Sequence, residues 1–504
     1  MRAAARALTV LSVLLTGCAH AALQYGRDGL MPVDHAVRVR LAAGQFGSAY
    51  DAALGREART RDRLLRALSV GALGLYANRT DSSVWALDRA WTLTEDRWSK
   101  RLSAGAAAVV VNDYLMPYTP GRTERLFIPF YGALSWLARH DAEDAAVEAR
   151  RLTLLLGQAD ADSAGDADAD VRGVMHYVAG AVFEAAGDRS AAEVAYRNAA
   201  RRLTVPVVRD TTAPDSLSGD VVVVVEQGFV GHPVPHDATV WVSRGEYDGL
   251  RRLDRERSHG PPDGDARVVR AVGVREGARV LDAGFFGPGY GPRFVTPVGL
   301  SLNWAEFRDG RAGAGMLEIA AAGASQEVRG GGNVSRAVHA DFERGQPARF
   351  ARALLRAAGR ATLYKAAGDQ LAKAGSDLND DGNGRDRPHG RRAGAGNNAR
   401  LPAGDPPATG DTPDDRTRTA AAVGRALLGL GLFAAAAASD VNDVPDLRSW
   451  NLLPHDVRVV RLRLPAGERE VQAVIDGRPV SVGRVLVRPG GVTVLSYRSF
   501  GDAR

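Results

Sequence analysis

The spacing of small and large residues between positions 178 and 199 is the feature that most restricts how this chain folds. Gly180 and Ala192 lie where two antiparallel helices would approach each other closely. The large side chains of Phe183 and Tyr196 would then fill the space beside that contact. The pattern predicts a helical hairpin with a close contact between its two helices.

This hairpin resembles a tetratricopeptide repeat in which Gly187-Asp188 forms the turn. Weaker copies precede it. Alanines at the corresponding position, from Ala49 to Ala192, are separated by 37, 59 and 47 residues, whereas the repeat has a period of about 34. The longest interruption falls over residues 109–125, because prolines there stop helices. We therefore expect an all-α domain of degenerate tetratricopeptide-like repeats over residues 35–202.

Helical repeats of this kind stack into curved arrays whose concave surface holds a peptide or protein segment. The resemblance thus implies a docking module, and we expect Phe183, Tyr196 and Trp136 to contribute to its binding groove. A plain all-α domain without a groove is the alternative.

The only cysteine, Cys18, directly follows a secretory signal composed of two arginines and a short apolar run. The apolar run is too short to span a bilayer as a permanent helix. The sequence Leu15-Thr-Gly-Cys18 resembles a bacterial lipobox, which implies removal of residues 1–17 and acylation of Cys18. Residues 18–34 would then form a lipidated tether. A secreted protein with an incidental cysteine is the alternative.

Acylation of Cys18 would determine both location and available chemistry. Ala19 follows it where an Asp would retain a lipoprotein at the inner membrane, so the resemblance implies the periplasmic face of the outer membrane. Several acyl chains anchor a protein durably. An acylated thiol serves neither nucleophilic catalysis nor zinc binding, and one cysteine forms no internal disulfide.

The net charge of +6 does not indicate a nucleic-acid partner. The 65 basic residues comprise 62 Arg and three Lys, and they alternate with Asp and Glu along the chain. Nucleic-acid-binding proteins instead gather basic residues into one patch or stripe. We expect an envelope protein partner and no nucleic acid.

Residues 203–375 combine strand and helix patterns and are expected to form an α+β middle domain. The run Val221–Val225 predicts a buried strand, and apolar residues at helical spacing predict a helix over 348–373. His232 and His236 are separated by two prolines, which prevent the helix that would place both imidazoles on one face. We expect no metal site and no cofactor.

Residues 376–417 are rich in Gly, Asp, Arg and Pro, which is typical of a disordered linker. The Ala- and Gly-rich stretch 418–440 then predicts an apolar helix. Its thirteen consecutive uncharged residues are too few to span a membrane. The helix is therefore either buried or placed against a membrane or partner, and burial is the preferred interpretation.

Residues 441–504 predict a small antiparallel β module, because four alternating stretches are joined by turn signals. The expected strands cover 456–464, 468–475, 480–487 and 491–497.

Two motifs in this region resemble a signature of a family of uncharacterised bacterial lipoproteins. They are Asp446-Leu-Arg448-Ser-Trp450 and the later Leu464-Pro-Ala-Gly467. Members combine a lipobox, tetratricopeptide-like helices, a mixed middle part and a C-terminal β module, and the family has no assigned activity. Arg448 and Trp450 are candidates for a binding pair. The alternative is a Trp that caps the β module with the Arg on its face.

Together these patterns predict a mixed α and β, multidomain protein. The leading hypothesis is a lipid-anchored, non-catalytic scaffold or regulator of an envelope protein complex, which binds a partner through its helical repeats. The alternative is a cell-envelope enzyme or ligand-binding protein that acts through residues 203–375, where paired carboxylates would supply acid and base. The sequence indicates no catalytic residue and no oligomeric state.

Overall fold

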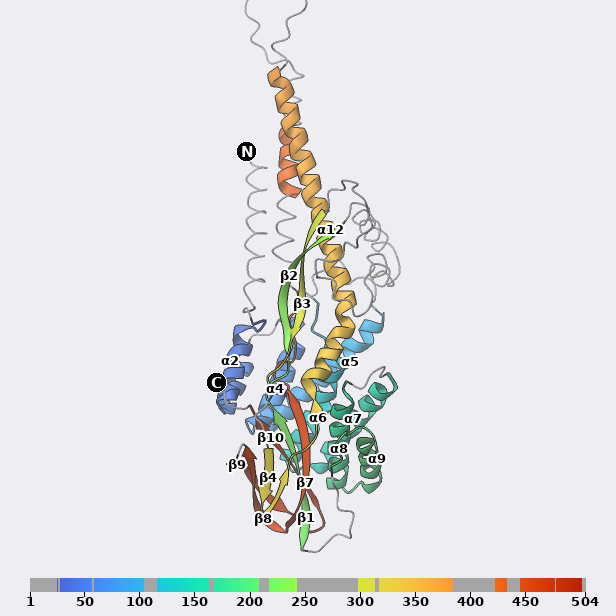
Figure 1. Cartoon of the computed structure of the whole chain (residues 1–504), viewed down its shortest axis with the longest axis vertical. Coiled ribbons are helices and arrows are strands. Elements are labelled where there is room, and N and C mark those ends of the chain that lie inside the picture. The colour runs from blue at the N-terminus through green and yellow to red at the C-terminus, as the bar shows by residue number, and fades with distance from the viewer. Residues whose placement is uncertain are drawn as a thin grey trace, which may run out of the picture.

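The computed structural model describes residues 25, 28–56, 59–103, 116–162, 167–207, 217–242, 298–312, 317–383, 422–432, 445–475 and 477–500. It is a mixed α/β structure, as expected. A body of helices packed on β-sheets carries a long helical stalk (Figure 1). Cys18 and the signal segment lie outside the described residues.

The helices of the N-terminal half pack successively, each against the next along the chain. In this arrangement α4, α6 and α8 form an inner layer, and α5, α7 and α9 form an outer layer. The helices are α2 (Pro32–Ala42), α3 (Phe46–Leu54), α4 (Arg63–Tyr76, after the short 3-10 turn η1, Thr60–Asp62), α5 (Thr80–Ser103), α6 (Arg122–Ala138), α7 (Ala142–Asp162), α8 (Ala169–Ala185) and α9 (Arg189–Ala200).

The hairpin of α8 and α9 contains the close contact predicted at Gly180. A Cβ atom added there would lie 2.8 Å from the ring of Tyr196, closer than real Cβ atoms approach. Gly187 has a φ of +83°, in the left-handed region that favours glycine. Asp188 then caps α9, because its carboxylate accepts a hydrogen bond from the backbone N–H of Ala191 at 3.1 Å. The turn therefore lies at the predicted residues.

The strands form two four-stranded sheets and a separate two-stranded ribbon. In the first sheet the order is β10-β1-β7-β6, with β1 parallel to β10 and antiparallel to β7. The second sheet has the order β5-β4-β8-β9, and β2 pairs with β3 in the ribbon. The strands are β1 (Ser218–Gln227), β2 (His232–Val242), β3 (Val298–Arg308), β4 (Leu317–Ala321), β5 (Ala324–Glu327), β6 (Gly332–Asn333), β7 (Asp456–Pro465), β8 (Gly467–Ile475), β9 (Arg478–Val487) and β10 (Val492–Ser499).

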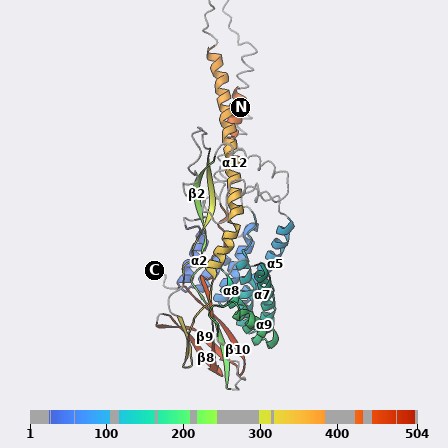
Figure 2. The same ribbon diagram turned by 45° about the vertical axis from the view of Figure 1, so that its right-hand side comes forward.

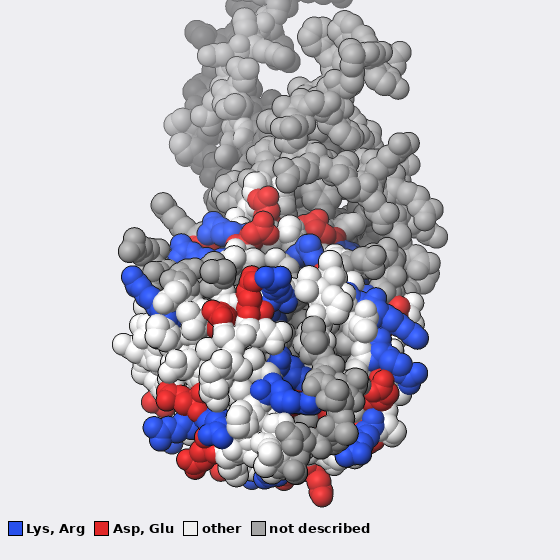
Figure 3. Space-filling model, turned by 60° about the horizontal axis from the view of Figure 1, so that its bottom comes forward, with Lys and Arg blue, Asp and Glu red and all other residues white. Residues whose placement is uncertain are grey.

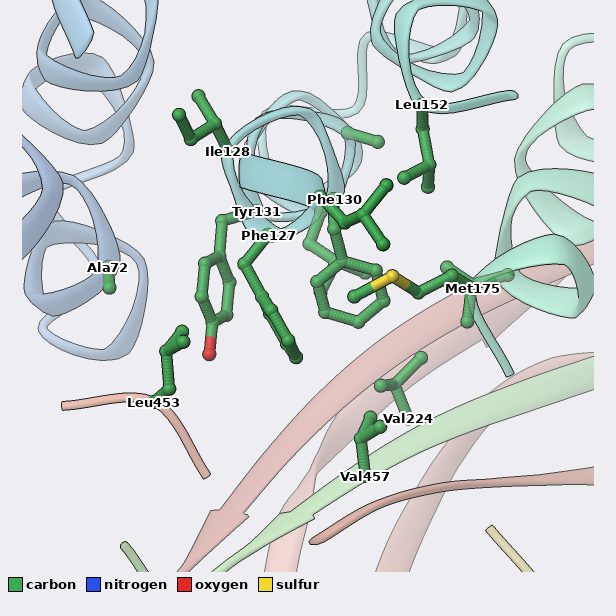
Figure 4. Packing of buried hydrophobic residues seen from close by; sticks show 14 of the residues in the cluster. Ala72, Phe127, Ile128, Phe130, Tyr131, Leu152, Met175, Val224, Leu453 and Val457 are labelled. Carbon is green, nitrogen blue, oxygen red and sulfur yellow. The ribbon is translucent and has the colours of Figure 1, made fainter. Parts of the chain in front are cut away.

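The valines of β1 are buried on both faces of the first sheet. Val222 and Val224 belong to the core shared with the inner helices, and Figure 4 shows Val224 facing the aromatic side chains of α6. The alternate valines, Val221, Val223 and Val225, pack in a second core with the other sheet. A strand covered on both sides needs no polar alternation, so its sequence is a continuous apolar run.

The sheets do not follow the expected division into a 203–375 domain and a 441–504 module. Strand β1 of the first segment lies between β7 and β10 of the second, and β4 pairs with β8. Because β10 runs parallel to β1, the C-terminal strands do not form a separate antiparallel module. Local alternation predicts strands but contains no information about which distant strands pair.

The stalk is formed by α12 (Val334–Asn383), which extends away from the body with the β2–β3 ribbon along its lower part (Figures 1 and 2). Asn333 begins this helix, because its side-chain oxygen accepts a hydrogen bond from the N–H of Arg336 at 2.7 Å. The helix is longer than the predicted 348–373 and includes residues 376–383 of the expected linker. A second helix, residues 422–432, lies beside it.

Candidate protein-binding surface

The segment that carries the signature motif, 446–453, is buried against the inner helices. Trp450 has no exposed surface, and its ring meets that of Tyr131 edge-on at a centroid distance of 5.7 Å. Its backbone N–H donates to the carboxylate of Glu124 at 2.7 Å. Trp450 is therefore a core residue and is not accessible to a partner.

Arg448 connects the same segment to η1 and to Met116, which precedes α6. Its guanidinium donates to Asp446 at 2.7 Å, to Asp62 at 3.0 Å and to the carbonyl of Met116 at 2.8 Å. It lies over the ring of Tyr118, not over Trp450. The pairing that the sequence suggested between Arg448 and Trp450 is thus replaced by separate, structural roles for the two side chains.

Phe183 and Tyr196 are also buried. The hydroxyl of Tyr196 donates to Glu184 at 2.7 Å and accepts a hydrogen bond from Arg461 of β7 at 3.1 Å. Arg461 also binds Glu184, at 2.9 Å, and Asp220 of β1. This network joins the helical hairpin to the first sheet.

The inner face of the helical array is therefore occupied by the protein itself. The core formed by α4, α6 and α8 continues into the inward valines of β1 and β7 and into residues 450–453 (Figure 4). A concave surface that other helical arrays use to hold a partner is here covered by the first sheet. Of the predicted groove residues, Trp136 alone remains partly exposed.

The outer layer presents a different surface around Trp85 of α5, whose exposed fraction is 70%. Asp81 and Asp88 lie one turn before and one turn after it on the same face of the helix. Asp81 pairs with Arg139 at the end of α6, and Asp88 pairs with Arg151 of α7 at 3.7 Å. These ion pairs fix the helices around an exposed tryptophan.

Both arginines also contact tryptophans. The guanidinium of Arg139 lies 5.0 Å from the ring centre of Trp136, and that of Arg151 lies 5.3 Å from the ring centre of Trp91. Leu154, which is 63% exposed, follows Arg151 by three residues on the same side of α7. We call this set the outer tryptophan surface: Trp85, Trp91, Trp136, Arg139, Arg151 and Leu154.

Glu148 lies beneath the outer tryptophan surface, between α6 and α7. Burial raises the pKa of its carboxyl group to about 7, and Arg151, whose guanidinium donates to it at 2.7 Å, opposes the shift. Arg151 therefore connects a solvent-facing partner, Asp88, with a carboxyl group that titrates near neutral pH.

Sequence reasoning identified Trp136 but missed Trp85, although a signal was available. Ala86, Leu87 and Ala90 form the buried stripe of α5. Trp85 instead shares the opposite stripe with Asp81 and Asp88. A large aromatic residue on the polar stripe of an amphipathic helix is predicted to be exposed.

Buried carboxylates among the described residues form hydrogen bonds within the core. Glu226 accepts hydrogen bonds from the hydroxyls of Tyr76, at 2.7 Å, and Tyr131, at 2.6 Å. Burial raises its pKa, and Arg498 opposes that shift. No group of three or more metal-binding side chains gathers within the part of the chain that the structure describes.

A small hollow of about 230 Å³ lies between α9 and residues 203–207. Tyr177 and Tyr196 line it together with Glu193 and Arg197. Sites for small ligands usually enclose about 300–1,000 Å³. Tyr196, one of the predicted groove residues, lines this hollow. The hollow is smaller than a typical ligand site.

Comparison with known proteins adds no relative. No family model matches the chain, and no curated protein or solved structure gives a match.

Proposed function

We propose that this protein is a lipid-anchored, non-catalytic scaffold of the bacterial cell envelope that binds a protein partner through its helical region. In this proposal the helices are a degenerate tetratricopeptide-like array, Cys18 is acylated, and the anchored protein faces the periplasm from the outer membrane. The partner binds the outer tryptophan surface, because the protein's own sheet covers the inner face.

The observation that carries this proposal is the exposure of Trp85 between two ion pairs, Arg139–Asp81 and Arg151–Asp88. Trp and Arg are enriched among the residues that dominate the affinity of protein interfaces. A tryptophan exposed to water gains free energy when a partner covers it. The arginines on either side pair with Asp81 and Asp88, which share a face of α5 with Trp85.

The chemistry of this surface defines the partner. An apolar segment of a protein would cover Trp85 and Leu154, and its polar groups would meet the Arg139–Asp81 and Arg151–Asp88 pairs around them. We therefore expect an envelope protein with an amphipathic helix or strand as the bound element.

The experiment is site-specific photo-crosslinking in intact cells. A photoreactive residue at position 85 should give one reproducible adduct, and Arg139→Ala should reduce its yield. The matched control is position 217, an equally exposed leucine outside this surface. Equal adducts at both positions, or none at position 85, would refute the binding surface.

The anchor is tested separately. Cys18→Ala should abolish metabolic labelling with a fatty acid and release the protein from the membrane fraction. A variant that remains labelled would contradict acylation at Cys18 while leaving the cross-linking result intact.

A further inference from the structure

In the upper part of the stalk, a second helix packs against α12 through small residues. Ala422 and Gly429, seven residues apart in the 422–432 helix, are buried against α12. A Cβ atom added at Gly429 would lie 2.8 Å from Cγ of Leu371 and 3.1 Å from the carbonyl oxygen of Ala367. Glycine is therefore required for the two backbones to approach this closely.

The large apolar residues of the same helix point away from that contact. Val423, Leu427 and Leu430 follow the i, i+4, i+7 spacing of one helical face, and all are more than half exposed. Leu428, beside them, is also more than half exposed. The preferred interpretation of this stretch as a buried helix is thus wrong for its large side chains.

This arrangement reverses the usual packing of helices in water. In water-soluble proteins the leucines lie between helices and the polar side chains lie outside. Small residues between helices, with leucines outside, are typical of helices surrounded by lipid. None of the described helices combines the length and hydrophobicity needed to cross a bilayer. The pair fits a position in the membrane interface, where a helix lies along the surface.

Exposed basic side chains of the stalk are complementary in charge to an anionic surface. Between Arg344 and Lys373 the chain has seven basic residues and one acidic residue, Asp369, but Arg360 is buried and Arg344 pairs with Asp341. Two of the protein's three lysines, Lys365 and Lys373, are exposed near the contact of α12 with the 422–432 helix. The lower face of the body differs, because acidic and basic side chains are mixed across it (Figure 3).

An acylated Cys18 would place a membrane close to the stalk. Tyr25 packs near Ala305 and Phe342, beside the base of α12. Seven residues separate it from Cys18 and span at most about 25 Å. The part of α12 from Phe342 to Leu371 is roughly 44 Å long, at 1.5 Å per residue. If Cys18 is acylated, the stalk lies within reach of the anchoring surface along much of this length.

We propose that the apolar face of the 422–432 helix, together with the exposed lysines Lys365 and Lys373 of α12, binds the surface of an anionic phospholipid membrane. This deepens the proposed function, because it gives the anchored scaffold a second, non-covalent membrane contact. The two contacts together would restrict the orientation of the body, and of its outer tryptophan surface, relative to the membrane.

The test uses the mature chain from position 18 with Cys18→Ala, so that no acyl chain contributes. It is mixed with vesicles of phosphatidylglycerol and phosphatidylethanolamine, and bound protein is measured by flotation. We expect binding that falls at least about tenfold in Leu427→Glu/Leu430→Glu, because two apolar side chains no longer enter the interface. Lys365→Glu and Lys373→Glu should each weaken binding by more than roughly fivefold.

Leu486→Glu is the matched control, because Leu486 is as exposed as Leu427 but lies on β9, outside both proposed surfaces. It should bind vesicles like the parent, and Leu427→Met/Leu430→Met should also retain binding. Failure of the parent to float, or unchanged flotation of the double glutamate variant, would overturn the proposal. Light scattering could instead show that the parent is a dimer and that the double glutamate variant is a monomer. If the parent then bound no vesicles, a second copy of the chain would cover this face and the proposal would be overturned. Acylation of Cys18 and cross-linking at position 85 are measured independently, so their failure is distinguishable from failure here.

Discussion

The inner and outer layers of the helical array use tryptophan in opposite ways. Trp450, on the inner side, has no exposed surface, whereas Trp85, on the outer side, is 70% exposed. The inner helices are covered by a sheet assembled from strands more than 200 residues apart in the chain. Among the described residues no sheet packs on the outer helices, and the arginines beside Trp85 form ion pairs with Asp81 and Asp88 and cation–π contacts with Trp136 and Trp91. The comparison separates residues that hold the protein together from residues available to a partner.

The largest expected effect comes from removing the inner tryptophan. Trp450→Ala should lower the free energy of unfolding by about 3–5 kcal/mol, because it leaves a cavity beside Tyr131 and removes buried apolar area. Urea denaturation followed by circular dichroism measures this loss. Trp450→Phe should recover part of it. A loss below about 1 kcal/mol would show that the inner face is not a packed core.

A smaller effect is expected at the close contact between α8 and α9. Gly180→Ala should destabilise the protein by about 1–3 kcal/mol, since the new methyl group collides with the ring of Tyr196. Gly157→Ala is the control, because nothing lies within 4 Å of a Cβ atom at that helical position. It should stabilise by up to about 1 kcal/mol through the higher helix propensity of alanine. Equal effects at both positions would contradict the close approach.

Sequence reasoning succeeded where the signal is local. It located the hairpin contact at Gly180, the strand at residues 221–225, and all four C-terminal strands within two residues at their starts. The exposed state of Leu427 and Leu430 and the start of α12 at residue 334 were not predicted. Amphipathic spacing predicts a helix but does not identify what lies beside each face.

The candidate site was predicted less well for a related reason. Phe183, Tyr196 and Trp450 are large, and large side chains fill a core as readily as a binding groove. Their burial follows from the pairing of β1 with β7 and β10, which joins segments that no local pattern connects. Trp136 differs because it lies near the C-terminal end of α6 and remains partly exposed.

The coupling of Glu148 to Arg151 predicts a pH dependence in the outer layer. The folded-state pKa of Glu148 is raised to about 7 from an ordinary value of 4.5. Between these values the folded state binds more protons than the unfolded state, so stability falls as pH rises through this window and is constant above it. Glu148→Gln should remove that slope and be more stable by about 1–2 kcal/mol at pH 8.

Thermal denaturation between pH 4.5 and 8 measures this effect. Glu143→Gln is the control, because Glu143 is an exposed residue of the same helix. If Glu148→Gln retains the pH dependence of stability seen in the parent, another group titrates in this window. The burial of Glu148 would then not be the cause of the pH dependence.

The smallest expected change in stability is at the outer tryptophan. Trp85→Ala should alter the free energy of unfolding by less than about 0.5 kcal/mol, since an exposed side chain loses little contact when truncated. The same change should weaken partner binding through the outer tryptophan surface by at least about thirtyfold, because tryptophan anchors commonly contribute about 2 kcal/mol or more. Binding is measured with the cross-linked partner once it is purified. A variant that unfolds like the parent but still binds would place the interface elsewhere, whereas a variant that is both destabilised and unable to bind would show that Trp85 belongs to the core. Only the combination of unchanged stability and lost binding supports the distinction between the two layers.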